Sequence, residues 1–126
     1  MNYNEKIIEA LSAIGLQIFP DLYDSEVEHY DKDGNLIEKL TEWLVFNYVD
    51  ERPSLFADDE DVFTKTVIDI HCYTPDSSKI FTYKKQIKNS LRAAEFVINS
   101  TNLSFENDTK MFHITVTVSD DNFTEV

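Results

Sequence analysis

The chain has 126 residues, 42% of them hydrophobic, and its 24 acidic side chains against 11 lysines and arginines give a net charge of −13. This length and composition suit one core, so we expect residues 1–126 to form a single domain. The charge argues against nonspecific binding to DNA or anionic membranes, and the single Cys72 excludes an internal disulfide or a multi-cysteine metal cluster.

The first predicted element is a helix that Asn2 or Asn4 can cap and that Gly15 ends. Its apolar residues recur at helical spacing, at Ile7, Ile8, Leu11 and Ile14. Glu5 and Glu9 within this pattern are unlike a signal peptide, and the chain contains no apolar run long enough to span a membrane. We therefore expect a soluble, intracellular protein.

An acidic stretch follows Pro20, and within it residues 31–35 read DKDGN, as many calcium-binding EF-hand loops begin. The positions that would supply oxygen ligands all match, at Asp31, Asp33, Asn35 and Glu42. However, Leu36 stands where the loop needs a glycine-like bend, and the flanking segments resemble strands. We therefore predict a protruding β-hairpin over residues 24–41 with Gly34 in its turn, and keep calcium binding as the alternative.

Two strands are predicted next, on either side of a polar loop. Residues 42–49 are dense in β-branched and aromatic side chains, which favours a central strand. Residues 64–74 alternate, which predicts a half-buried strand. Its inward residues would be Thr66, Ile68, Ile70 and Cys72. The loop, residues 50–61, exposes Leu55 and Phe56 and ends in an acidic run that is an alternative site for a hard cation. The run consists of Asp58, Asp59, Glu60 and Asp61.

The last third of the chain predicts one helix and two closing strands. Ser77 or Ser78 can cap the helix, and its apolar stripe is Ile80, Tyr83, Ile87, Leu91, Ala94 and Ile98. The strands are expected around residues 103–105 and 111–118, joined by a turn at residues 107–108. In the last strand the inward residues would be Phe112, Ile114, Val116 and Val118. This order predicts an α+β fold, with two helices packed on one face of a mostly antiparallel sheet of four to five strands and an added β-hairpin.

The sequence predicts no catalytic, cofactor-binding or metal-binding residue. The three histidines, His29, His71 and His113, are dispersed, and we interpret them as ordinary residues of sheet faces. His71 and Cys72 are adjacent on a predicted strand and so point to opposite faces, which excludes a thiol–imidazole pair between them. The motifs GxSxG, HExxH and Walker A are absent. We therefore expect a protein that is not an enzyme.

Charge is distributed unevenly along the chain. Residues 21–61 contain 14 acids and three bases, whereas residues 79–95 contain five bases and one acid. On the second predicted helix Lys84, Lys88 and Arg92 form a stripe beside the apolar one. With this net charge, we expect the basic stripe to pair with acids, either of its own chain or of a neighbouring subunit.

Three stretches together carry a family resemblance. They are EALSAIGLQIFPDLY (residues 9–23), WLVFNYVDERPSLFADDEDV with TKTVIDIHCYT (residues 43–62 and 64–74), and KKQIKNSLRAAEF with ENDTKMFHITVTV (residues 84–96 and 106–118). The chain resembles the small tail completion, or tail terminator, proteins of long-tailed bacteriophages of Gram-positive hosts. The most specific part is ERPSLFADDED, in which Ser54 takes the place of an alanine. Residues 26–40 look like an insertion relative to that family.

The resemblance implies a virion protein of the tail or neck, assembled in the host cytoplasm. It implies a homohexameric ring that contacts the tail tube protein and a head-completion protein, while DNA passes through the lumen without specific binding and no membrane is involved. We hypothesise that the acidic, apolar segment of one subunit meets the basic stripe of the next. The predicted interface residues are Arg52, Leu55, Phe56, Asp58, Asp59, Glu60, Asp61, Lys84, Lys88 and Arg92. A head-completion or neck connector protein and an acidic inhibitor that mimics DNA are the alternative functions.

Overall fold

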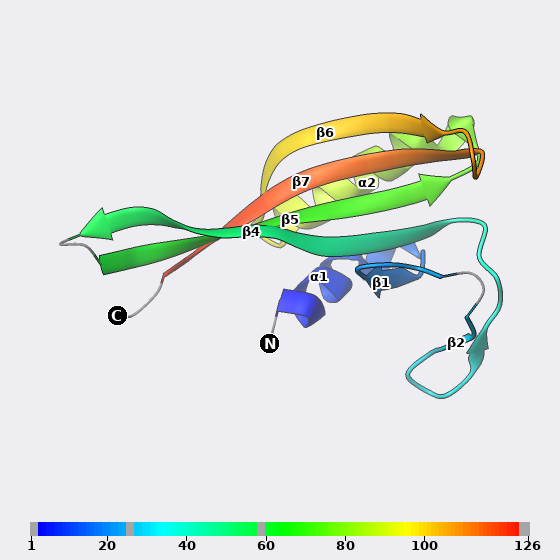
Figure 1. The fold of residues 1–126 in the computed structure, drawn as a ribbon, viewed down its shortest axis with the longest axis horizontal. Helices are drawn as coiled ribbons and strands as arrows, with labels where there is room; N and C mark the ends of the chain where they lie inside the picture. The colour runs from blue at the N-terminus through cyan, green and yellow to red at the C-terminus, as the bar shows by residue number, and fades with distance from the viewer. Residues whose placement is uncertain (1–2, 25–26, 58–59, 124–126) are drawn as a thin grey trace.

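Two helices cover one face of a five-stranded sheet, and a small hairpin projects from one end of the molecule (Figure 1). The computed structural model describes the backbone of residues 3–24, 27–57 and 60–123, and the side chains of residues 4–24, 27–49 and 66–120. The predicted α+β fold is confirmed. The elements are α1 (Tyr3–Leu11), the 3-10 turn η1 (Ser12–Ile14), β1 (Ile18–Pro20), β2 (His29–Tyr30), β3 (Leu36–Ile37), β4 (Trp43–Ala57), β5 (Glu60–Thr74), η2 (Ser77–Lys79), α2 (Ile80–Ala93), β6 (Val97–Glu106) and β7 (Met111–Phe123).

The main sheet has the strand order β1-β4-β5-β7-β6, with β1 parallel to β4 and every other pair antiparallel. Its register places Phe46 of β4 opposite Ile70 of β5, and Ile70 opposite Val116 of β7. Because side chains alternate between the faces of a sheet, one face carries the apolar residues of all three strands. The inward residues predicted for these strands are buried at Thr66, Ile68, Ile70, Cys72, Ile114, Val116 and Val118, and Phe112 is partly buried against them.

The core lies between this sheet face and the helices. α1 contributes Ile7 and Leu11, and both are at most 1% exposed. The buried residues of α2 are Ile80, Tyr83, Ile87 and Leu91. Burial of one large aliphatic side chain stabilises a fold by about 1.5–3 kcal/mol, so this shared cluster holds both helices on the sheet. Neither helix is long and apolar enough to cross a membrane, and the described chain contains no other α-helix.

The helix ends follow local rules that the sequence predicted only in part. Gly15 follows α1 and η1 with a φ of 84°, which confirms the predicted glycine terminator. The predicted serine caps of the second helix are wrong, because the Asp76 carboxylate caps the entry turn by accepting the amide of Ser78 at 2.9 Å. α2 ends at Ala93, so Ile98 of the predicted stripe belongs to β6.

β4 and β5 are longer than predicted. The prediction of a loop over residues 50–61 is wrong, because β4 continues to Ala57 and β5 begins at Glu60. β1 pairs with β4 only as far as Phe46, so the outer edge of β4 beyond that residue has no partner strand in the described chain. Pro53 cannot donate to a ladder and is tolerated on such an edge. The antiparallel pairing therefore continues through residues whose composition indicated a loop.

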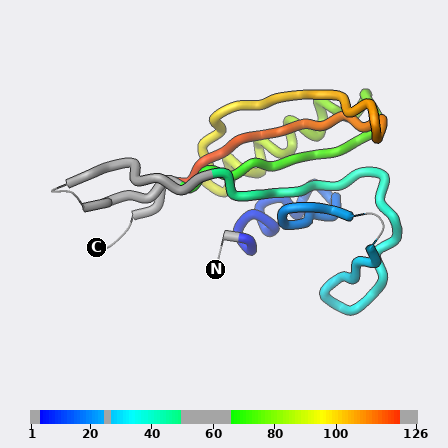
Figure 2. The backbone as a smooth tube through the Cα atoms, in the orientation of Figure 1, coloured from blue at the N-terminus to red at the C-terminus, as the bar shows by residue number. Residues whose placement is uncertain are grey.

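A short hairpin forms within residues 24–41, as predicted, from β2 and β3. Figure 2 shows it beyond the β1 edge of the main sheet, on the chain just before β4. His29 anchors it, because its ring lies 5.1 Å from that of Phe19 and 5.0 Å from that of Tyr23, between centroids. The backbone amide of Leu40 also donates to the Tyr23 hydroxyl at 3.1 Å. These contacts fix the hairpin against the body of the protein.

The hairpin turn excludes the EF-hand alternative at residues 31–35. The Asp31 carboxylate accepts the backbone amides of Asp33 and Asn35, each at 2.9 Å, and these hydrogen bonds lower the pKa of Asp31. Gly34 takes a φ of 82°, as the turn requires. Strands flank this turn, whereas an EF-hand needs a helix on each side.

Candidate subunit interface

α2 presents two different faces. Four apolar residues on its sheet side are buried, as given above, and they fix how the helix is rotated. The opposite side carries Lys84, Lys88 and Arg92, with Lys85 beside them. Phe81 lies among these cations and is 79% exposed. Phe81 gives this group of cations an apolar centre, and aromatic residues and arginine are enriched at protein–protein interfaces.

This cationic face consists of the residues that line one open surface pocket: Phe81, Lys84, Lys85, Lys88, Asn89 and Arg92. Within the part of the chain that the structure describes, none of its four cations forms an ion pair or a hydrogen bond. Elsewhere Lys6 pairs with Asp120 at 2.7 Å, and Lys79 pairs with Glu42 at 3.2 Å. Four like charges over about two and a half helical turns repel one another, so the cationic face favours an anionic partner.

The structure brings together only part of the predicted interface. Lys84, Lys88 and Arg92 share the cationic face. The other predicted residues are Arg52, Leu55, Phe56, Glu60 and Asp61, whose side chains lie outside the described set, and Asp58 and Asp59, which lie outside the described residues. Their contact with α2 stays a prediction. Sequence analysis missed Phe81 and Lys85, although their positions off the apolar stripe already place them toward solvent.

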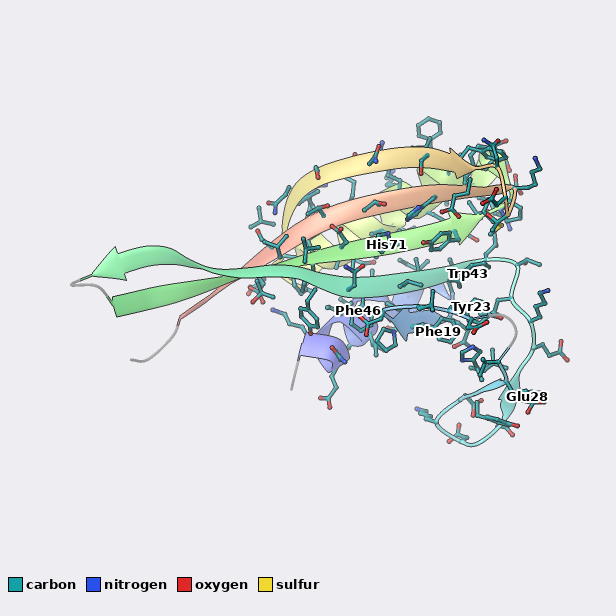
Figure 3. All side chains as sticks on the ribbon, in the orientation of Figure 1. Phe19, Tyr23, Glu28, Trp43, Phe46 and His71 are labelled. Carbon is teal, nitrogen blue, oxygen red and sulfur yellow. The ribbon has the colours of Figure 1, made fainter. Side chains whose placement is uncertain are left out.

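The sheet face opposite the helices carries a row of aromatic and imidazole rings (Figure 3). Trp43 of β4 lies 5.3 Å from Tyr73 of β5, and Tyr73 lies 4.4 Å from His113 of β7, between ring centroids. Tyr23 extends the row toward the hairpin, 4.9 Å from Trp43. His71 adjoins its other end, 4.9 Å from His113. The row connects four chain segments across the face that no helix of the described chain covers.

His71 and His113 are hydrogen-bonded to each other within this row. His71 Nε2 lies 2.7 Å from Asn47 Oδ1, and an amide oxygen only accepts, so Nε2 carries the proton. His71 Nδ1 therefore accepts a hydrogen bond from His113 Nε2, at 2.7 Å. If both imidazoles were charged, two N–H groups would face each other across this distance. The geometry thus disfavours the doubly protonated pair.

Burial and mutual repulsion shift the titration of this pair. Burial lowers the pKa of His71 below 6.5, and the charge of His113 lowers it further, whereas Asp69 raises it. Burial also lowers the pKa of His113, against the opposing effects of Glu106 and Asp69. In the folded protein both histidines therefore take up protons at lower pH than in the unfolded chain.

Stability is expected to depend on pH through this pair. The unfolded histidines bind protons near pH 6.5 and the folded ones bind them at lower pH, so the unfolded state takes up more protons as pH falls. The free energy of unfolding should therefore decrease as pH falls from about 7.5 to 5.5. Denaturant unfolding at a series of pH values measures this decrease. The double variant His71→Gln and His113→Gln should show a shallower dependence, and an unchanged slope would contradict the assignment.

Glu42, which matched the last ligand position of the EF-hand loop, instead connects the sheet to α2. Its carboxylate accepts the Thr74 hydroxyl at 2.5 Å, the Tyr83 hydroxyl at 2.7 Å and the Lys79 ammonium at 3.2 Å. Burial alone would raise the pKa of Glu42, but these three donors outweigh it and hold the pKa below 4.5. Glu42 therefore acts in the fold as a charged acceptor.

The thiol of Cys72 is unsuited to nucleophilic chemistry in this arrangement. Cys72 is fully buried, and burial raises the pKa of its thiol to about 12, so it carries no thiolate at neutral pH. Among the described residues no three His, Cys, Asp or Glu side chains gather so that they could hold a metal ion. The sequence matches no protein-family model and no curated protein.

Proposed function

We propose that this chain is a tail terminator of a long-tailed bacteriophage. Copies of it close into a ring on the end of the tail tube, stop the growth of the tube and offer the surface to which the head attaches. The proposal is supported by the sequence resemblance over residues 9–118, and within the structure by the cationic face of α2, whose charges have no partner in the described chain. A cyclic ring needs a contact in which one patch meets a different patch of the neighbour, and this face is suited to be one of the two.

Electrostatics would make such a ring depend on a template. Six subunits carry a formal charge of six times −13, or −78, so free subunits repel one another and associate without a template only at high concentration. The tail tube would supply the surface on which they gather, and the contact between unlike patches would offset the repulsion. Acids that face the lumen would repel DNA phosphates during passage. The ring would then offer an exposed surface to which the head-completion protein binds in the virion.

The test is electron microscopy of tails assembled from the cognate tail proteins with and without this chain. Tubes of defined length are expected in its presence and overlong tubes in its absence. A triple variant, Lys84→Glu, Lys88→Glu and Arg92→Glu, should also give overlong tubes, because it removes the cationic face. The control variant Lys110→Glu reverses an exposed lysine that lies outside both α2 and the hairpin, and it should terminate tubes normally. Normal length in the absence of the chain, or its purification with DNA-filled heads in place of tails, would refute the proposal.

A further inference from the structure

The hairpin of β2 and β3 carries the charge opposite to that of the cationic face. Between residues 27 and 38 there are four acids and one lysine. Asp31 holds the turn, and Glu28 accepts the hydroxyl of its neighbour Tyr30 at 2.7 Å. Asp33 and Glu38 are exposed, and neither carboxylate has an ion pair or hydrogen bond in the described chain. These two are available to an external cation.

The same hairpin exposes apolar surface between its acids. Tyr30 is 57% exposed and Leu36 is 54% exposed. The two are directly opposite each other in the β2–β3 pairing, so both side chains lie on the same face of the hairpin. Phe81 supplies a matching apolar centre among the cations of α2. Each surface is therefore an apolar centre with charges around it, and the charges are of opposite sign.

These two surfaces lie far apart in one chain. Figure 1 shows the hairpin beyond the β1 edge of the sheet, whereas α2 lies behind the strands of the other half. A hairpin of this chain therefore does not cover its own α2. The rings that contact His29 hold the hairpin in place, which reduces the entropy lost when it docks.

We infer that the hairpin of one subunit docks on the cationic face of α2 of the next subunit. Tyr30 and Leu36 pack against Phe81, while Asp33 and Glu38 lie against the lysines and Arg92. The inference rests on the proposed ring, and it names the hairpin as the anionic patch in place of residues 50–61. Because the two patches differ, each added subunit presents a free hairpin to the next, which is the geometry that closes a ring.

The contact is tested by cysteine crosslinking of the full chain at high concentration. The variant Leu36→Cys and Phe81→Cys should form a ladder of disulfide-linked oligomers on mild oxidation, while Cys72 is fully buried and unavailable. Adding Asp33→Lys and Glu38→Lys should reduce the yield of disulfide-linked oligomers about tenfold, because attraction becomes repulsion at two positions. Adding Lys84→Glu and Lys88→Glu to the same chain should restore it, since the charges again match. Asp31 is left unchanged because it holds the turn.

Three results would overturn the inference, and they are distinguishable from failure of the terminator proposal. The first is a ladder that persists after reversal of Asp33 and Glu38, and the second is the absence of rescue by the helix reversal. The third is loss of the ladder on reversal of Asp58 and Asp59 but not of the hairpin acids, which would assign the contact to residues 50–61. Tail length is measured in a separate experiment. If the crosslinked ladder forms but tube length is not controlled, the contact between subunits is supported and the terminator function is refuted.

Discussion

Replacement of Phe46 by alanine is expected to lower the free energy of unfolding by about 3–5 kcal/mol. Phe46 is 1% exposed and lies on β4 between Pro20 of β1 and Ile70 of β5, in the core shared by both helices. The substitution leaves a cavity in the core beside β4. Because β4 is paired with β1 on one edge and with β5 on the other, the surrounding residues move into the cavity only partially. Urea unfolding followed by circular dichroism measures the loss.

Phe81→Ala is the matched control, since it removes the same atoms from a side chain that is 79% exposed. Its free energy of unfolding should stay within about 0.5 kcal/mol of the wild-type value. Equal losses at the two positions would contradict the assignment of Phe46 to the core and of Phe81 to the outer face of α2. A loss confined to Phe46 would support both.

The elements that the sequence predicted well are those with a strong period. Alternation over residues 64–74 gave the inward residues of β5, and the spacing of Ile80, Ile87 and Leu91 gave the buried side of α2. Burial on one face of a strand or helix leaves a repeating pattern that is legible in the sequence. Gly15 was predictable for a different reason, because its positive φ suits a residue without a Cβ.

The predictions that were wrong concern features that depend on contacts between residues far apart in the sequence. The continuation of β4 and β5 through residues 50–61 depends on pairing of the two strands, and the local composition there favoured a loop. Glu42 looked like a calcium ligand because only its spacing from Asp31 is visible in the sequence. Its donors Thr74 and Tyr83 are more than 30 residues away along the chain. No local pattern encodes such a contact.

The candidate interface was likewise predictable from the sequence only in part. The positive charge of residues 79–95 and the negative charge of residues 21–61 are visible in composition. Which cations lack a partner, and which acids of the hairpin point outward beside apolar surface, follow only from the fold. Phe81 illustrates the difference, because its exposure is decided by the side of α2 that packs on the sheet.

Replacement of Glu42 by alanine is expected to lower the free energy of unfolding by about 2–4 kcal/mol, because three donors lose a charged acceptor. Thr74 is fully buried and Tyr83 is 9% exposed, so water replaces the carboxylate poorly at both hydroxyls. Lys79 loses its ion pair as well. Denaturant unfolding at pH 7 measures the effect, and Glu38→Ala on the hairpin, an exposed glutamate without a partner in the described chain, should change stability by no more than about 0.5 kcal/mol.

Glu42→Gln separates the charge of this carboxylate from its shape. The amide keeps one acceptor oxygen for a hydroxyl but carries no charge, so we expect a loss smaller than that of Glu42→Ala. The folded pKa of Glu42 lies below 4.5, so its stabilising effect is present above that pH and is lost as pH falls through the lower, folded value. The difference between wild type and Glu42→Gln should therefore be full at pH 7 and shrink in acid. A difference that stays constant down to pH 3 would show that the shape of residue 42, and not its charge, is what connects β5 to α2.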